Sequence, residues 1–321
     1  MDRNKFEKWN LSSNIIRRIQ KMKKRFKPLD ILGSTRINEA ELSNEISLEI
    51  SVLKGLDIFT DAHVQGVAKM TTAMCQRMGM PYEELKKCVL AAYLHDVGKI
   101  KIPPEILQKT SRLTDEEFEI MKKHTIYGYE ICMEYKNFKD LAPIVRAHHE
   151  NMDGTGYPDG LKGDEIPKEA QIIKVADVYD ALTQKRQYKD GYKISDALKM
   201  MVQDVKNKKM SGEYLVYLLM VVYDKVTEER NTHEKNVMQY RNNLEILHEL
   251  EGIYKQIYDQ GLTKKLERKL KRFELAPGYD MSTNANLLII KQRALEKEIE
   301  KMKLYESEQE EIQKLIKQLK I

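Results

Sequence analysis

The sequence predicts an all-α protein, and three patterns lead to this expectation. Apolar residues recur at three- and four-residue steps through most of the 321-residue chain, as they do on the buried face of an amphipathic helix. No alternating run of β-branched residues indicates a strand. Past about Val226, Lys and Glu become abundant between recurring Leu and Ile, which is typical of long paired helices. We therefore expect helices throughout, with loops where Gly and Pro gather.

The N-terminal region is expected to form a short basic helix from Ser12 to Lys27, which Pro28 ends. Its basic residues are Arg17, Arg18, Lys21, Lys23, Lys24, Arg25 and Lys27. A solvated helix face is favoured over a surface that binds nucleic acid or anionic lipid, so nucleic acid is not an expected partner. A second helix is expected from about Ile37 to Lys54.

The middle of the chain carries clear helix boundaries. Pro81, followed by two acidic residues, opens a helix that leads to His95, and Gly98 with the prolines after it closes this segment. Thr114 and Glu117 have the spacing of a capping box at the start of the helix that bears His124.

Three further segments complete the expected fold. Asp140 to His149 is predicted to be helical, 153–167 is predicted to be a turn-rich loop, and Ala170 to Leu182 returns to helix. Long charged helices then run to Ile321 with a break at 276–278. A hairpin of this kind most often mediates packing or dimerisation.

Composition narrows the class of protein. The longest apolar run is about half of the ~20 residues that a membrane helix needs, and the first residues are charged, so we expect no transmembrane segment, no signal peptide and a cytoplasmic location. The three cysteines form no CxxC pair and are expected to be reduced core residues.

The histidines cluster in sequence, since five of the seven fall between residues 63 and 149. The pair His148-His149 and the pair His95-Asp96 suggest metal ligation, because imidazole and carboxylate together suit iron, manganese and zinc. Asp177 lies in an apolar helical context, where a carboxylate is costly unless it is paired or coordinates a cation. These residues therefore predict a metal site.

Two motifs resemble a known family. His95-Asp96-Val97-Gly98-Lys99 is similar to the HD signature of metal-dependent phosphohydrolases. The run HHENMDGTGYPDGL from His148 to Leu161, with Ile166-Pro167 after it, is similar to the segment that defines the HD-GYP subfamily. The resemblance covers about residues 50 to 226 and implies an HD-type helical bundle. With it, the expected domains are a basic arm (1–36), an HD-GYP catalytic domain (37–226) and a charged helical extension resembling a coiled coil (227–321).

The resemblance also implies a ligand set for two divalent metals, iron or manganese by family. A bridging Asp96 would be shared by both ions. The first ion would be held also by His63, His95 and Asp177, and the second by His124, His148 and His149. Some members bind a third metal through a glutamate four residues before the first histidine, but that position is Phe59 here. We therefore expect two metals.

Basic and aromatic residues near the motifs are expected to contact substrate. Lys99 lies four residues after His95 and, on a continuing helix, would face the same side and neutralise a phosphate oxygen. Arg186 and Lys189 stand where the family has phosphate-contacting residues. Tyr157 lies in a glycine-rich loop that borders the substrate opening by resemblance, or is only a rigid loop.

The resemblance implies hydrolysis of cyclic di-GMP to linear pGpG, GMP or both, by attack of a metal-bridging hydroxide, with Asp96 and Lys99 as catalytic residues. Two alternatives stay open: a hydrolase of another cyclic dinucleotide such as cyclic GMP-AMP, and a receptor that binds without cleaving. Expected partners are the cyclic dinucleotide, a second copy of this chain through the C-terminal helices and a GGDEF-type cyclase at the glycine-rich loop around Gly156-Tyr157-Pro158, the GYP loop.

Overall fold

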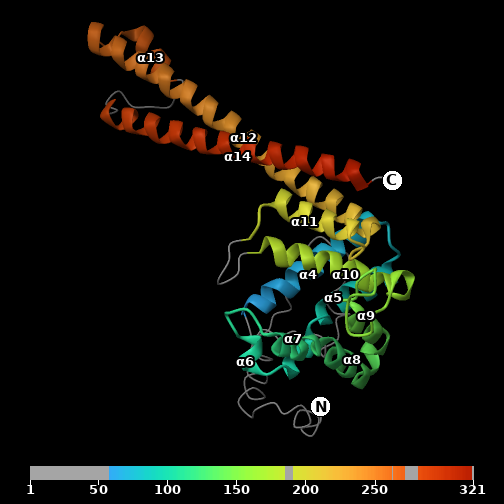
Figure 1. The fold of residues 1–321 in the computed structure, drawn as a ribbon. Coiled ribbons are helices and arrows are strands. Elements are labelled where there is room, and N and C mark those ends of the chain that lie inside the picture. The colour runs from blue at the N-terminus through green and yellow to red at the C-terminus, as the bar shows by residue number, and fades with distance from the viewer. Residues whose placement is uncertain (1–57, 185–190, 262, 272–280, 320–321) are drawn as a thin grey trace. The chain divides into compact units, whose positions relative to one another are not determined.

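The computed structural model describes residues 58–184, 191–261, 263–271 and 281–319 (Figure 1). These residues form helices and turns, with no strand among them beyond one isolated bridge between Asp153 and Lys162. The all-α prediction is thereby confirmed for the described part of the chain. The expected basic helix, the helix from Ile37 to Lys54 and the 276–278 break lie outside these residues.

The chain divides into two compact units. One holds the helices up to Val221 together with Leu315–Ile321, and the other is Val222–Lys314. The domain boundaries expected from the sequence stay predictions. None of the helices in the described ranges is long and apolar enough to cross a membrane.

The first unit is a bundle of short helices. In chain order these are α4 (Ile58–Arg77), α5 (Tyr82–Leu94), the 3-10 helix η2 (Val97–Lys101), α6 (Pro104–Leu107), α7 (Asp115–Lys122), α8 (His124–Glu134), η3 (Lys136–Leu141), α9 (Ala142–Ala147), η4 (Gly163–Glu165), α10 (Lys168–Thr183), α11 (Ile194–Lys206) and the start of α12 (Gly212–Gln260). The helix α4 packs against α5 and α10, while α8 packs against η2 and α9. The candidate site forms where these two groups of helices meet.

The core is apolar and closely filled. Fully buried side chains include Met74, Leu94, Phe138 and Ile173, from four different elements. Burial of such side chains contributes about 1.5–3 kcal/mol each to stability. All three cysteines are buried free thiols, as expected from their spacing.

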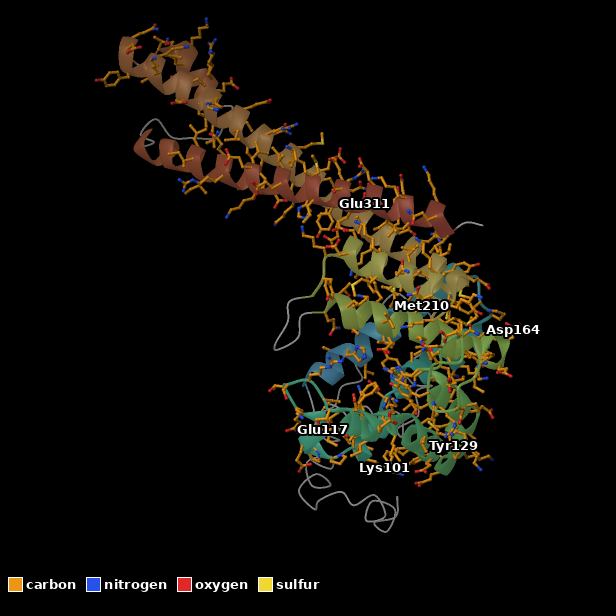
Figure 2. The ribbon with its side chains drawn as sticks, in the orientation of Figure 1. Lys101, Glu117, Tyr129, Asp164, Met210 and Glu311 are labelled. Carbon is orange, nitrogen blue, oxygen red and sulfur yellow. The ribbon has the colours of Figure 1, made fainter. Side chains whose placement is uncertain are left out.

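Several helix boundaries agree with the sequence. The α5 helix begins at Tyr82, directly after Pro81. The capping box at α7 is present, because the Glu117 backbone N–H donates to Thr114 Oγ1 at 3.3 Å and the Thr114 N–H donates to Glu117 Oε2 at 2.8 Å. Glu117 is labelled on α7 in Figure 2.

The helix predicted over Asp140 to His149 is shorter than expected. Its first residues belong to the 3-10 helix η3, and the α-helix α9 runs only from Ala142 to Ala147. Pro143 lies in the first turn of α9, the part of a helix where a missing N–H leaves no bond unmade. His148 and His149 therefore follow the helix end.

The second unit pairs the later part of α12 with α14 (Met281–Leu319), and α13 (Lys264–Lys271) lies between them in sequence. Gln309 of α14 donates to Thr227 of α12 at 2.8 Å, and His233 of α12 contacts Glu298 of α14 at 2.7 Å, so the helices run antiparallel. The α12 helix ends at Gln260, before Gly261 with φ of +75°, a break that the sequence analysis did not predict.

The two histidines of this unit differ in exposure. His248 is exposed, whereas the side chain of His233 is only 14% exposed and stacks on Tyr305. Its burial follows from the pairing of α12 with α14, which the local sequence pattern does not display.

Candidate metal centre

The fold brings together seven histidine and aspartate side chains from distant parts of the sequence. They are His63 on α4, His95 and Asp96 after α5, His124 at the start of α8, His148 and His149 after α9, and Asp177 on α10. All seven were expected as ligands. Five of them are buried, His63 is 9% exposed, and His149 is half-buried.

The seven side chains form two groups. The ligand atoms of Asp96, His124, His148 and His149 lie within 4.8 Å of one another, and so do those of His63, His95 and Asp177. The division is the one that the resemblance implied for two ions. Each group combines imidazole nitrogens with carboxylate oxygen, a donor set that suits first-row transition metals.

Asp96 lies between the two groups. Its Oδ2 atom is 3.3 Å from His95 Nε2 and 3.9 Å from His63 Nε2, while its Oδ1 atom is 3.5 Å from His124 Nε2. One carboxylate oxygen therefore faces each group, as a bridging ligand would. His63 Nε2 also lies 3.0 Å from Asp177 Oδ1 within its own group.

Hydrogen bonds behind the histidines set the direction of their rings. His95, His124 and His148 each place Nδ1 at 2.7 Å from the backbone carbonyl three residues earlier. A carbonyl can only accept, so Nδ1 carries the proton and Nε2 keeps its lone pair toward the cluster. Nε2 of His95 is buried and has no hydrogen-bond partner among the residues that the structure describes.

Burial and charge give the histidines different roles. Burial lowers the pKa of His149 to about 3 and holds the pKa of His148 well below its usual range, so both imidazoles stay neutral. Burial would also lower the pKa of His63, but Asp177 and Asp180 outweigh it and raise that pKa to about 9. A position where carboxylates favour positive charge, beside neutral imidazoles with free lone pairs, suits a divalent cation.

The carboxylates of the cluster are ionised. Burial would raise the pKa of Asp96, but Lys99 and the surrounding histidines bring it well below its usual range. Burial opposes ionisation of Asp177 too, and His63 lowers the pKa of that carboxyl far enough to outweigh it. The chain therefore presents two anionic oxygen donors at neutral pH, and the donor set fits bound metal ions.

The GYP loop closes one side of the cluster. The carboxylate of Glu150, 1% exposed, accepts hydrogen bonds from the backbone N–H groups of Asp159, Gly160 and Leu161 at 2.7, 3.0 and 3.1 Å. A Cβ atom at Gly156 would lie 2.2 Å from the Asn151 backbone nitrogen, so only glycine fits there. The ring of Tyr157 is thereby held 4.9 Å from the ring of His149.

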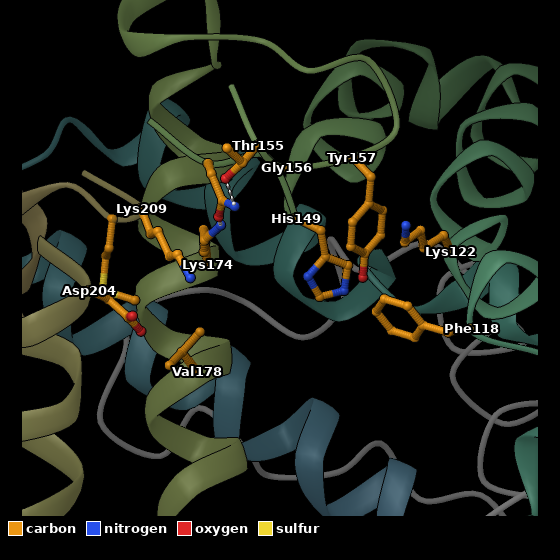
Figure 3. A pocket seen from close by; sticks show the side chains of 12 residues that line it. Phe118, Lys122, His149, Thr155, Gly156, Tyr157, Lys174, Val178, Asp204 and Lys209 are labelled. Carbon is orange, nitrogen blue, oxygen red and sulfur yellow. Dashed lines mark hydrogen bonds between the residues drawn. The ribbon is translucent and has the colours of Figure 1, made fainter. Parts of the chain in front are cut away.

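A cavity of about 410 Å³ opens beside the cluster (Figure 3). His149 belongs both to the cluster and to the wall of the cavity, and Tyr157 lines the wall beside it. The remaining wall includes Phe118 and Lys122 of α7, Lys174 of α10 and Asp204 of α11. A volume of this size falls within the range of about 300–1,000 Å³ that is typical of small-molecule sites.

Residues 40–212 match the HD domain family, which covers more than half of the chain. This chain belongs to the HD domain family. The match and the relatives below confirm the resemblance drawn from the HD and GYP motifs.

Curated relatives of this HD domain protein include several phosphodiesterases. It is 41% identical over 141 residues to the cyclic di-GMP phosphodiesterase response regulator RpfG of Xanthomonas campestris, covering 43% of this chain and 37% of that protein. It is 37% identical over 186 residues to a cyclic di-GMP phosphodiesterase of Thermotoga maritima, covering 55% and 50%. It is 44% identical over 135 residues to the 3'3'-cGAMP-specific phosphodiesterase 2 of Vibrio cholerae, covering 41% and 26%. The chain thus spans about a quarter to a half of the length of these relatives.

Of the residues expected to contact substrate in this HD domain, only some lie in the described part of the chain. Lys99 lies at the cluster, with Nζ 2.6 Å from Asp96 Oδ2, but the helix does not continue through it as expected. The α5 helix ends at Leu94, and Lys99 belongs to η2, so it reaches Asp96 across three residues of a 3-10 turn. Arg186 and Lys189 lie outside the described residues, beyond the end of α10 at Thr183.

Two further residues support the cluster in roles that were not predicted from the sequence. Asp180 accepts from His63 Nδ1 at 2.7 Å, and Glu150 holds the GYP loop. Asp180 follows Asp177 by three residues and therefore shares its helix face, a spacing that could have indicated it. Glu150 lies within the HHENMDGTGYPDGL run, but its role could not be predicted from it, because its partners are backbone groups whose positions depend on the folded loop.

Proposed function

We propose that this HD domain hydrolyses a phosphodiester bond of cyclic di-GMP, giving linear pGpG, GMP or both. The observation that carries the proposal is the position of Asp96, with one carboxylate oxygen toward each of two groups of neutral or carboxylate-paired histidines. The relatives named as cyclic di-GMP phosphodiesterases support the choice of substrate.

The proposal includes two divalent metal ions, iron or manganese. Asp96 would be shared by both, with His63, His95 and Asp177 around one ion and His124, His148 and His149 around the other. Bound ions of this kind supply Lewis acidity, which makes water nucleophilic at neutral pH and offsets charge on a phosphate.

The side chains of the chain would then bind and orient the substrate. The Lys99 ammonium, 23% exposed at the edge of the cluster, would neutralise a non-bridging phosphate oxygen as the charge on it increases. Tyr157 would present its ring to a base or ribose at the cavity wall. Arg186 and Lys189 remain proposed phosphate contacts.

The test is hydrolysis of cyclic di-GMP by protein purified anaerobically and supplied with iron or manganese, with metal content measured. Wild type should turn over with about two metals per chain. Asp96→Asn should lose turnover and bind less metal, because a neutral amide is a poor bridge between cations. Asp164→Asn, at an exposed acid outside the cluster, is the control. Full turnover by Asp96→Asn would show the mechanism to be wrong.

A second candidate is hydrolysis of a mixed cyclic dinucleotide. The relative named as 3'3'-cGAMP-specific favours it, since its identity to this chain is as high as that of the cyclic di-GMP enzymes. Parallel turnover assays on both substrates separate the two. Metal binding without turnover on either would favour a receptor that binds and does not cleave.

The partners expected from the sequence belong to this proposal as well. They are a second copy of the chain, which would bind through the C-terminal helices, and a GGDEF-type cyclase at the GYP loop. The cytoplasmic location also stays a prediction.

A further inference from the structure

The cavity beside the cluster has two chemically different sides. Figure 3 shows Phe118, Tyr157 and Lys122 on one side, Asp204, Lys174 and Lys209 on the other, and His149 between them. A phosphate held at the cluster would therefore have space on both sides of it. A cyclic dinucleotide has that form, since its two bases flank the phosphates.

The aromatic side carries no preference between bases. The rings of Phe118 and Tyr157 meet edge to face at 6.3 Å, and the Lys122 ammonium lies 5.1 and 5.7 Å from their centroids. Aromatic rings and cations attract the π face of every base. This side can hold a base, but it cannot distinguish guanine from adenine.

The opposite side contains an acceptor without a hydrogen bond. Asp204 lies near the end of α11, and its backbone carbonyl accepts the Lys209 N–H at 2.9 Å. Its side chain is half-buried and lines the cavity, and it makes no hydrogen bond with another described residue. Lys174, the nearby cation, instead donates to the Glu150 carbonyl and the Asn151 side chain.

The chemical groups of Asp204 and Lys209 together match one base, guanine. A carboxylate offers two acceptors and no donor, and guanine presents two adjacent donors, N1–H and the N2 amino group, on its Watson–Crick edge. The exposed ammonium of Lys209 lines the same side and suits the neighbouring O6 acceptor of guanine. Adenine has an acceptor at N1 and a donor at N6. In the same position, its N1 acceptor would face the Asp204 carboxylate and its N6 donor would face the Lys209 ammonium, so neither could form a hydrogen bond.

We propose that Asp204 is a specificity-determining residue that recognises a guanine base, with Lys209 beside it. The proposal rests on the proposed function for its substrate, and it deepens that function by selecting guanine over adenine at one of two base positions.

The test compares substrate preference in metal-loaded, full-length protein. Asp204→Asn replaces one acceptor by a donor, so the ratio of kcat/KM for cyclic di-GMP to that for cyclic di-AMP should fall about tenfold or more. Asp196→Asn makes the same charge change on an exposed position of α11 and should leave the ratio unchanged. An unchanged ratio in Asp204→Asn would overturn the proposal, even if overall turnover fell.

Binding of single nucleotides separates this proposal from the proposed function. Calorimetry on wild type should give tighter binding of GMP than of AMP, and Asp204→Asn should remove the difference. If wild type cleaves no cyclic dinucleotide but shows this GMP preference and its loss, the proposed function is wrong and the guanine site stands. If wild type binds GMP and AMP equally, the guanine site is wrong whatever the turnover.

Discussion

Single residues in the cluster are positioned by the groups behind them. Three histidines use a backbone carbonyl within their own turn, whereas His63 uses the carboxylate of Asp180, on another helix. The direction of the His63 ring therefore depends on the packing of α4 against α10. Such outer carboxylates fix the tautomer of a metal-binding histidine and raise its basicity.

Asp180→Ala should weaken metal binding without removing a ligand. We expect affinity for manganese to fall about 10- to 100-fold, because His63 loses the group that holds its Nε2 lone pair toward the site. Competition against a chelator of known affinity measures the change. Asp180→Asn, whose amide oxygen still accepts from Nδ1–H, should restore most of the affinity. Equal losses in both variants would rule out a positioning role.

At the scale of residues, motifs predicted the cluster almost completely. Four of the seven positions lie in the two motif runs, which start at His95 and His148. The other three, His63, His124 and Asp177, are single residues that the resemblance to the family assigned. Asp204 could not be predicted from a motif, because it lies in a helix without any. Its proposed role in base recognition follows only from its position in the cavity wall.

The helices differ from their predicted bounds where close packing against another helix determines the backbone conformation. The sequence predicted that a helical turn carries Lys99, and the chain instead forms η2 against α8. A Cβ atom at Gly98 would lie 1.9 Å from the His124 carbonyl oxygen, so this contact requires glycine. The sequence shows the glycine but not the helix that lies against it, 26 residues further along the chain.

The pairing of α12 with α14 contains a half-buried polar contact with a pH dependence. His233 and Asn236 bond to Glu298, and these bonds lower the pKa of Glu298 from 4.5 to about 2. Because the folded pKa lies below the ordinary value, this contact stabilises the fold fully above about pH 4.5. The stabilisation is lost as the pH falls toward 2.

Glu298→Gln should therefore lower the stability of the full chain at neutral pH by an amount that vanishes in acid. Thermal melts followed by circular dichroism at pH 7, 4.5, 3 and 2 measure the difference from wild type. Glu300→Gln, an exposed position on the same helix, should show no such trend. A difference that stays constant across this range would contradict the assignment of the low pKa to Glu298.

For the whole molecule, the sequence predicted helices everywhere and a charged extension after the catalytic region, and the described residues agree on helix. The sequence could not predict which helix faces remain exposed to solvent. The second unit leaves several large apolar side chains exposed, namely Met238, Ile246, Tyr258, Ile289, Ile290 and Leu304. Exposed apolar groups on paired helices are typical of surfaces that bind another chain.

The predicted homodimer can be tested on this surface. Ile289→Lys with Ile290→Lys, at positions 52% and 61% exposed, should convert a dimer to a monomer, since two charges would replace buried apolar contacts. Light scattering on the full chain gives the mass. Gln292→Lys, an exposed neighbour, should leave the dimer intact. A wild-type protein that is monomeric at all concentrations would show the dimer prediction to be wrong.

The three backbone N–H groups gathered by Glu150 have a consequence for how this site can change over evolutionary time. Because one buried carboxylate supports the loop from Asp159 to Leu161, and Gly156 has no room for a side chain, most substitutions in the loop would disturb the wall that carries Tyr157. Asp204, by contrast, is half-buried near the end of α11 and lines the cavity without belonging to this loop. New substrate preferences should therefore arise by exchange of side chains on α11, while the loop stays as it is.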